Sequence, residues 1–154
     1  MPAQRNAPQL ALLEELNQDI GSGKITVSNN AEVFFDEVTH RFPLEGSKIA
    51  WATMPDCISR TINYDDYNNS ITDFFELVVV AAGLSSADSI IVIGDSALDV
   101  ALSMSIGILR KHLINIVEMP QHTYVLPKNA DWCACYTLEG FMDFGFSPSV
   151  IKAI

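Results

Sequence analysis

SIIVIGDSALD, residues 89–99, is the stretch of this chain that indicates its fold most clearly. The four apolar residues 90–93 predict a strand that is covered on both faces, and Gly94 predicts a tight turn after it. Beyond the turn, the apolar pattern predicts a long helix that starts near Asp95 and continues to about Val117. A buried strand that passes through a short turn into a helix is typical of a parallel α/β sheet.

The sequence on both sides of this stretch continues the alternation of helices and strands. Apolar residues recur at helical spacing in three further segments, residues 8–20, 29–42 and 71–82. Short apolar segments predict additional strands at residues 24–27, 49–54, 122–126 and 132–136. A last helical turn is expected at 138–144, and the polar residues 61–70 are expected to form a loop.

These elements predict one domain over residues 1–154, with the architecture of a three-layer α/β/α sandwich. Its central sheet is expected to be mostly parallel and Rossmann-like, with strands of mixed direction at the edges. The chain is long enough to bury a core of its own, and 49% of its residues are apolar.

The net charge of -10 restricts the possible partners. An acidic chain is repelled by nucleic acids and by anionic membrane surfaces, so neither is an expected partner. Glu14 and Glu15 interrupt the only apolar segment near the N-terminus, and no apolar run is long enough to cross a membrane. Three cysteines, an odd number, suit a reducing compartment. We therefore expect a cytoplasmic protein.

The turn after the buried strand resembles two enzyme motifs. Gly94-Asp95 followed by Asp99 resembles the Gly-Asp-x-x-x-Asp element of haloacid-dehalogenase-type phosphatases, and the resemblance implies a magnesium ion held by the two aspartates. That family also needs an upstream Asp-x-Asp motif, but the nearest candidate, at Asp36, has Val38 where the second aspartate belongs.

Gly-Asp-Ser at 94–96 also resembles the corresponding block of lipase-like esterases, which implies that Ser96 is a nucleophile. A serine nucleophile needs a positioned base, and in those esterases the base lies in an Asp-x-x-His element. None of the three histidines, His40, His112 and His122, has an aspartate three residues before it.

A small hydrolase using Asp95, Ser96 and Asp99 is therefore the alternative function. The simpler interpretation is that Asp95 or Ser96 caps the helix and Asp99 complements its dipole. The sequence contains no complete catalytic set, so we assign no catalytic residue and expect a protein that is not an enzyme. Cys133 and Cys135 are too close for the usual zinc pair, and no metal or other cofactor is expected.

The clearest functional signal is an acidic stretch without basic residues. From Thr61 to Leu109 the chain has no Lys or Arg, but it has seven carboxylates: Asp65, Asp66, Asp73, Glu76, Asp88, Asp95 and Asp99. Aromatic residues surrounded by carboxylates are typical of binding surfaces. The predicted partner-binding residues are Tyr64, Asp65, Asp66, Tyr67, Asp73 and Glu76. A second acidic face is predicted at Glu32, Asp36 and Glu37.

In kind, the chain resembles bacterial immunity proteins that neutralise the toxins of contact-dependent growth inhibition. The whole chain carries this resemblance through its small size, its acidic segment from Tyr64 to Glu76, its lack of a disulfide framework and its lack of catalytic machinery. The resemblance implies a cytosolic inhibitor that covers the substrate-binding surface of a basic toxin domain, most plausibly a nuclease. A carboxylate array suits that role because a nuclease site must attract phosphates.

Overall fold

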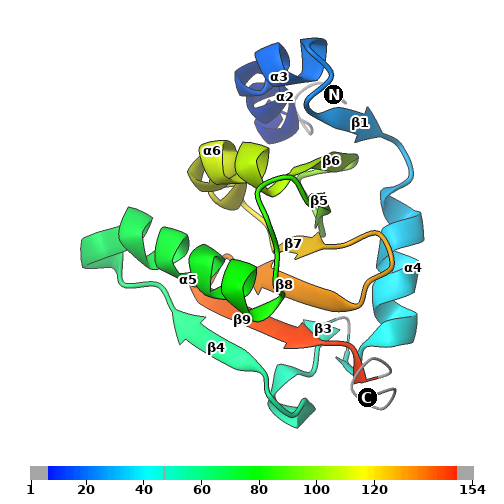
Figure 1. The fold of residues 1–154 in the computed structure, drawn as a ribbon, viewed down its shortest axis with the longest axis vertical. Coiled ribbons are helices and arrows are strands. Elements are labelled where there is room, and N and C mark those ends of the chain that lie inside the picture. Colours follow the sequence, from blue (N-terminus) through cyan, green and yellow to red (C-terminus); the bar gives the residue numbers. More distant parts are fainter. Residues whose placement is uncertain (1–6, 47, 149–154) are drawn as a thin grey trace.

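The computed structural model describes residues 7–46 and 48–148 and contains a seven-stranded sheet with helices on both faces (Figure 1). The strands lie in the order β1-β6-β5-β7-β8-β9-β4, and every neighbouring pair is antiparallel. Their bounds are β1 Thr26–Ser28, β4 Ile58–Thr61, β5 Ser89–Gly94, β6 Ala101–Ser105, β7 Thr123–Leu126, β8 Trp132–Tyr136 and β9 Phe141–Phe146. The prediction of a mostly parallel, Rossmann-like sheet is therefore wrong, although the protein is of the α/β type.

The helices lie on both faces of this sheet, and short elements connect them. The α-helices are α2 Ala7–Glu15, α3 Asn17–Gly21, α4 Ala31–Arg41, α5 Tyr67–Ala81 and α6 Ile106–Val117. A small hairpin is formed by β2 Leu44–Glu45 and β3 Lys48–Ile49, and two 3-10 turns are η1 Trp51–Thr53 and η2 Tyr64–Asp66. Within the described residues, no helix is long and apolar enough to cross a membrane.

The connection that follows β5 makes the next strand, β6, run antiparallel to it. Residues 95–100 do not begin a helix; they connect β5 to β6, which runs back along it with Val92 opposite Leu102. The helix α6 begins only at Ile106, where the Ser105 hydroxyl accepts a hydrogen bond from the Ile108 amide at 3.2 Å. The predicted helix from Asp95 to Val117 is thus a connection, a strand and a shorter helix.

The connection after β5 is held in place by a buried glutamine. Gln121 is 3% exposed, and its Oε1 accepts hydrogen bonds from the amides of Ala97 at 2.9 Å and Leu98 at 2.8 Å. A Cβ atom at Gly94 would lie 2.0 Å from the same oxygen, so only glycine fits beside this side chain. These contacts satisfy two backbone amides in a connection that forms neither helix nor strand.

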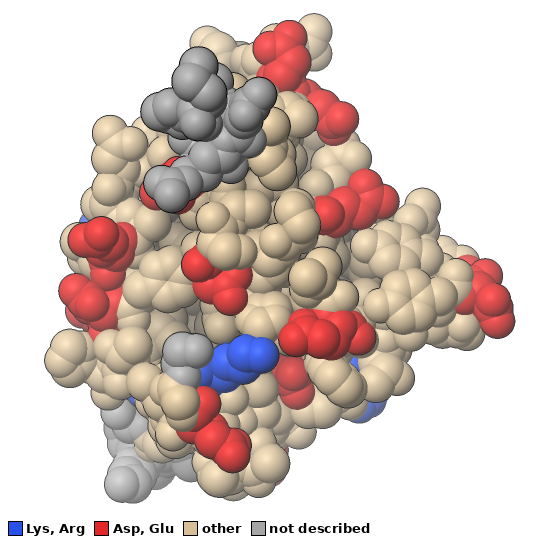
Figure 2. All heavy atoms as spheres, turned by 180° about the vertical axis from the view of Figure 1, so that it is seen from behind, with Lys and Arg blue, Asp and Glu red and all other residues tan. Residues whose placement is uncertain are grey.

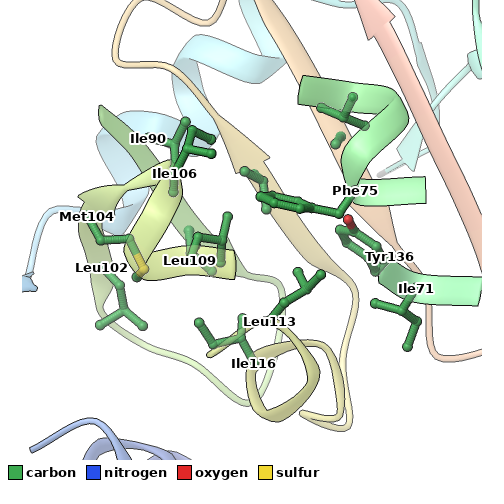
Figure 3. Packing of buried hydrophobic residues seen from close by; sticks show 14 of the residues in the cluster. Ile71, Phe75, Ile90, Leu102, Met104, Ile106, Leu109, Leu113, Ile116 and Tyr136 are labelled. Carbon is green, nitrogen blue, oxygen red and sulfur yellow. The ribbon is translucent and has the colours of Figure 1, made fainter. Parts of the chain in front are cut away.

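The prediction that β5 is covered on both faces is confirmed. Ile90 and Val92 point into the core beneath α5 and α6, whereas Ile91 and Ile93 point into a second core beneath α4. Figure 3 shows the first core, in which side chains of α5 and α6 meet those of the strands. Alternate strand residues therefore enter different cores, and each fully buried large side chain contributes about 1.5–3 kcal/mol.

Several other predicted elements need correction. Residues 49–54 were expected to form one strand, but only Ile49 belongs to β3 and the 3-10 turn η1 comes next. The helical turn expected at 138–144 is instead a turn that leads into β9, in which alternate residues are buried in the first core. The loop expected at 61–70 is shorter, because α5 already begins at Tyr67. The helix expected at 8–20 is interrupted at the buried Leu16.

Candidate partner-binding site

The predicted binding residues begin at the 3-10 turn η2 and continue onto α5. The Asn63 side chain accepts a hydrogen bond from the Asp65 amide at 3.1 Å, and this contact shapes the turn. Tyr64 is 65% exposed, and its ring stacks on that of Tyr67 with 6.1 Å between centroids and 27° between planes. The turn thus presents a stacked pair of aromatic rings at the surface.

Three of the predicted carboxylates lie in this turn or farther along α5. Asp65, Asp66 and Asp73 are all exposed, and Asp73 lies about 9 Å along the helix axis from Tyr67. Asp66 accepts a hydrogen bond from the Asn69 side chain at 3.0 Å. Within residues 7–46 and 48–148, none of the three forms an ion pair. We call these five residues, Tyr64, Asp65, Asp66, Tyr67 and Asp73, the acidic aromatic surface.

Glu76, the sixth predicted residue, is held by a cation. Its two carboxylate oxygens accept hydrogen bonds from Arg110 at 2.9 and 3.0 Å. Arg110 belongs to α6, which packs beside α5, so a residue far along the chain neutralises part of the acidic stretch. Glu76 therefore joins two helices, and its charge is already paired within the protein.

Two exposed apolar residues extend the acidic aromatic surface along α5. Leu77 is 40% exposed and Val80 is 80% exposed. They lie four and seven residues after Asp73, which places all three on one face of the helix. The run of apolar residues at 77–80 is typical of a helix face buried in a core. The sequence pattern therefore did not indicate that Leu77 and Val80 are exposed.

The second acidic face lies on the other side of the sheet. Glu32, Asp36 and Glu37 are exposed on α4, which covers the core opposite to that of α5. Figure 2, the view from behind, shows carboxylates spread over the rear of the molecule with few Lys or Arg residues among them. The two predicted acidic faces are therefore separate surfaces.

The structure also contains a pocket that the sequence did not indicate. Its volume is about 220 Å³, and it lies on the α4 side of the sheet, over strands β7, β8 and β9. We call it the His122 pocket. Its lining residues are Lys48, Ile49, Trp51, His122, Tyr124, Cys135, Thr137, Glu139, Phe141 and Asp143.

His122 connects two carboxylates at the side of this pocket. Its Nδ1 lies 3.1 Å from Asp95 Oδ2, and its Nε2 lies 3.0 Å from Glu139 Oε2. The His122 amide also donates to Asp95 Oδ1 at 2.9 Å. The hydrogen bond from His122 holds the pKa of Glu139 below its usual value, and Lys48 lies 3.7 Å from the same carboxylate. His122 is 27 residues from Asp95 and 17 residues from Glu139 in the sequence, so only the folded sheet brings the three together.

Asp143 projects into the pocket from β9. Burial raises the pKa of its carboxyl group, and a hydrogen bond from the Ser59 hydroxyl partly opposes that effect. Ser59 lies directly opposite Asp143 in the pairing of β4 with β9. The pocket therefore contains a carboxylate that has lost much of its contact with water.

The β8–β9 turn brings the His122 pocket close to the acidic aromatic surface. Gly140, in this turn, accepts a hydrogen bond from the Ile62 amide at 2.8 Å. A Cβ atom at Gly140 would lie 2.6 Å from the Tyr64 hydroxyl, so the tyrosine packs directly over the turn. Glu139, the preceding residue, reaches His122. Leu138 and Phe141 are 64% and 53% exposed and provide apolar contact area between the two sites.

The residues of the alternative hydrolase are not arranged for helix capping, because no helix begins at this turn. The carboxylate of Asp95 pairs with His122, while the Ser96 hydroxyl donates to Asp95 at 3.3 Å. Over the described part of the chain, Ser96 has no hydrogen bond to a histidine, which a serine nucleophile would need. The Asp99 amide donates to the side chain of Gln9.

Two of the three cysteines are buried, and one of them, Cys135, also lines the His122 pocket. Cys133 and Cys135 are buried in the core beneath α4, and burial raises the pKa of both thiols. A thiol with a raised pKa is a poor nucleophile and a poor metal ligand. Among the residues that the structure describes, no group of three or more His, Cys, Asp or Glu side chains is placed to hold a metal ion.

No protein-family model matches the chain, and no curated protein matches it either. The chemistry of the surface is therefore the basis for assigning a function.

Proposed function

We propose that this chain is an acidic, cytoplasmic inhibitor of the immunity-protein type, which binds and neutralises a basic toxin domain. A nuclease is the class of toxin that best fits this chemistry. The observation that most supports the proposal is the acidic aromatic surface, where exposed Tyr64 stacks on Tyr67 next to Asp65, and Asp73 is exposed farther along α5.

Electrostatics favours a basic partner for this surface. Carboxylates without counter-charges repel one another, and this repulsion is relieved when a positively charged surface covers them. The cleft of a nuclease is basic because it must hold phosphates, so an array of carboxylates can occupy the same place and exclude the substrate. Complementary charge also accelerates association, which benefits an inhibitor that must act before the toxin does.

The aromatic pair gives such a complex an anchor. Tyrosine rings bury a large area on binding and lose little conformational entropy, and polar groups around them exclude water. Tyr64 and Tyr67 already stack in the free protein, so little further ordering is required when the partner arrives. Leu77 and Val80 can extend the apolar contact along α5.

The test begins with capture of partners by the tagged chain of residues 1–154 from its native cells. The captured basic domain is then assayed for nuclease activity and for binding to two variants. One variant reverses charge on the acidic aromatic surface, Asp65→Lys/Asp66→Lys/Asp73→Lys. The matched control reverses three carboxylates on the opposite face, Glu32→Lys/Asp36→Lys/Glu37→Lys.

We expect the first variant to lose affinity by on the order of 100-fold and to lose inhibition, whereas the control retains most of both. Equal losses in the two variants would show that net charge matters and that this surface does not. A captured domain whose activity the parent protein leaves unchanged would contradict the inhibitor function.

A further inference from the structure

The His122 pocket has the size of a site for a single side chain. Its volume of about 220 Å³ is below the range of about 300–1,000 Å³ that is typical of pockets for small-molecule ligands. Trp51, Tyr124 and Phe141 line it, so it has aromatic walls as well as polar groups. Phe141 is 53% exposed and lies on the way in from the surface.

The charges around the pocket favour a cation as its occupant. Glu139 and Asp143 both line it, and Asp95 lies behind His122. The cation that lines the pocket is Lys48, and both Lys48 and the imidazole of His122 are engaged by Glu139. Asp143 has only the neutral Ser59 hydroxyl as a hydrogen-bond partner among the described side chains. An anionic ligand would meet these carboxylates, and a neutral apolar one would leave Asp143 without a counter-charge.

We propose that the His122 pocket receives the guanidinium group of an arginine side chain from the basic partner, with the aromatic walls stacking on it and Asp143 accepting its hydrogen bonds. This inference rests on the proposed function and assigns the partner residue that anchors the complex. A guanidinium fits such a pocket because it is planar, stacks on aromatic rings and pairs with a carboxylate through two hydrogen bonds.

The position of the pocket allows one partner to reach both sites. The turn that carries Glu139 also supports Tyr64 through Gly140. A partner seated on the acidic aromatic surface therefore passes over Leu138 and Phe141 before it reaches the pocket. An arginine beside Asp143 also stabilises the ionised form of a carboxylate whose pKa burial has raised.

The test is an NMR titration of the full chain with N-acetyl-arginine amide. The neutral isostere N-acetyl-citrulline amide is the chemical control, and N-acetyl-lysine amide separates guanidinium from charge alone. The signals to follow are the Trp51 indole and the Phe141 amide. Asp143→Asn removes the charge but keeps an oxygen for the Ser59 hydrogen bond, and Glu14→Gln, at an exposed position of α2, is the matched variant outside both sites.

We expect saturable shifts at Trp51 and Phe141 with the arginine compound, about tenfold weaker binding in Asp143→Asn, and unchanged binding in Glu14→Gln. If Asp143→Asn does not fold, Phe141→Leu provides the second variant, since loss of the aromatic wall should weaken arginine binding several-fold. The inference is overturned if the arginine compound gives no saturable shift, if citrulline or lysine binds equally well, or if the folded pocket variants bind as the parent does.

These results can be separated from those on the proposed function. If arginine binds in the pocket while charge reversal at Asp65, Asp66 and Asp73 leaves inhibition intact, the role of the acidic aromatic surface is contradicted and the role of the pocket is supported. If inhibition depends on that surface but arginine does not bind in the pocket, only the proposal of an arginine site is contradicted.

Discussion

Glu76 on α5 and Arg110 on α6 form a two-pronged ion pair, with Nε–Oε2 and Nη2–Oε1 distances of 2.9 and 3.0 Å. Arg110 also lies over the Phe75 ring, 5.7 Å from its centroid, and donates to the Ser86 hydroxyl at 3.1 Å. The guanidinium thereby connects two helices that share one core. It is also the cation that the acidic stretch lacks in its own sequence.

This ion pair predicts that Glu76 contributes to stability and that Asp73, three residues before it, contributes to partner binding. Glu76→Gln should lower the free energy of unfolding by up to about 1 kcal/mol, because both side chains of the pair are about 40% exposed and solvent screens them. Asp73→Asn should leave stability within about 0.5 kcal/mol of the parent. Urea denaturation measures both, and partner affinity should fall only in Asp73→Asn. If Glu76→Gln lost more partner affinity than Asp73→Asn, Glu76 would belong to the binding surface.

The buried hydroxyl of Tyr136 predicts a stabilising substitution. Tyr136 is 1% exposed, and in the described part of the chain its hydroxyl has no hydrogen-bond partner. The ring meets Phe74 edge-on at 5.6 Å, and Figure 3 shows the hydroxyl among apolar side chains. Tyr136→Phe keeps the ring contacts and removes a polar group that costs free energy when it is unsatisfied.

We therefore expect Tyr136→Phe to raise the free energy of unfolding by about 1 kcal/mol, measured by chemical denaturation. A loss of stability of similar size would show that the hydroxyl has a partner, such as a buried water molecule. Tyr67→Phe, at a half-buried position near the surface, serves as the comparison and should change stability by less than about 0.5 kcal/mol.

The contact between Gly94 and Gln121 predicts a coupled pair of substitutions. Gly94→Ala should lower the free energy of unfolding by about 2 kcal/mol or more, because the new methyl group displaces a side chain that holds two amides. In a Gln121→Ala background the same substitution should cost much less, since the obstacle is gone. Gly21→Ala, with open space around its Cβ position, should change stability by less than about 0.5 kcal/mol. Additive effects at 94 and 121 would show that the two positions do not interact.

Asp19 predicts a pH dependence of stability. The residue is 5% exposed, and its Oδ2 atom lies 2.6 Å from His112 Nε2 and 3.1 Å from Lys111 Nζ. These contacts connect α3 to α6. The hydrogen bond from His112, followed by that from Lys111, lowers the pKa of Asp19 below its ordinary value of 3.8. A carboxyl group with a lowered pKa in the folded state contributes stability above its ordinary pKa, and this contribution is lost as pH falls through the folded value.

Asp19→Asn should therefore be less stable than the parent at neutral pH, and the difference should shrink as the pH falls below 3.8. Thermal unfolding followed across the acidic range measures the effect. A difference that stays constant from neutral pH to the acid limit would mean that Asp19 acts through packing and not through its charge.

Local patterns in the sequence predicted much of the fold but not the direction of its strands. The apolar run at 90–93 correctly indicated a strand with two covered faces, since burial depends on the residues themselves. Direction depends on whether the chain crosses over or turns back after Gly94. Between Ala97 and Val117 a strand and a helix are both apolar, and no proline separates them. Ser105, the helix cap, was the one local signal of the boundary.

The candidate site was partly predictable for a related reason. The exposure of Tyr64, Asp65 and Asp73 follows from a polar segment that precedes an amphipathic helix, which is local information. The pairing of Glu76 with Arg110 joins two helices, and the pocket joins His122 to Asp95 and Glu139 across strands. Contacts of this kind exist only after the sheet has assembled, so no local pattern contains them.

The sheet order has a consequence for how the chain is made. The two edge strands, β1 and β4, pair with strands that are synthesised much later. Val27 lies opposite Leu102, and Ile58 lies opposite Phe144. Contacts between segments so distant in sequence slow folding, and until they form β1 and β4 are unpaired edges that can aggregate. The turn that supports Tyr64 is also synthesised after α5, so Tyr64 lacks this support until Gly140 has been added to the chain. We therefore expect a newly made chain to need a short period of maturation before it can engage any partner.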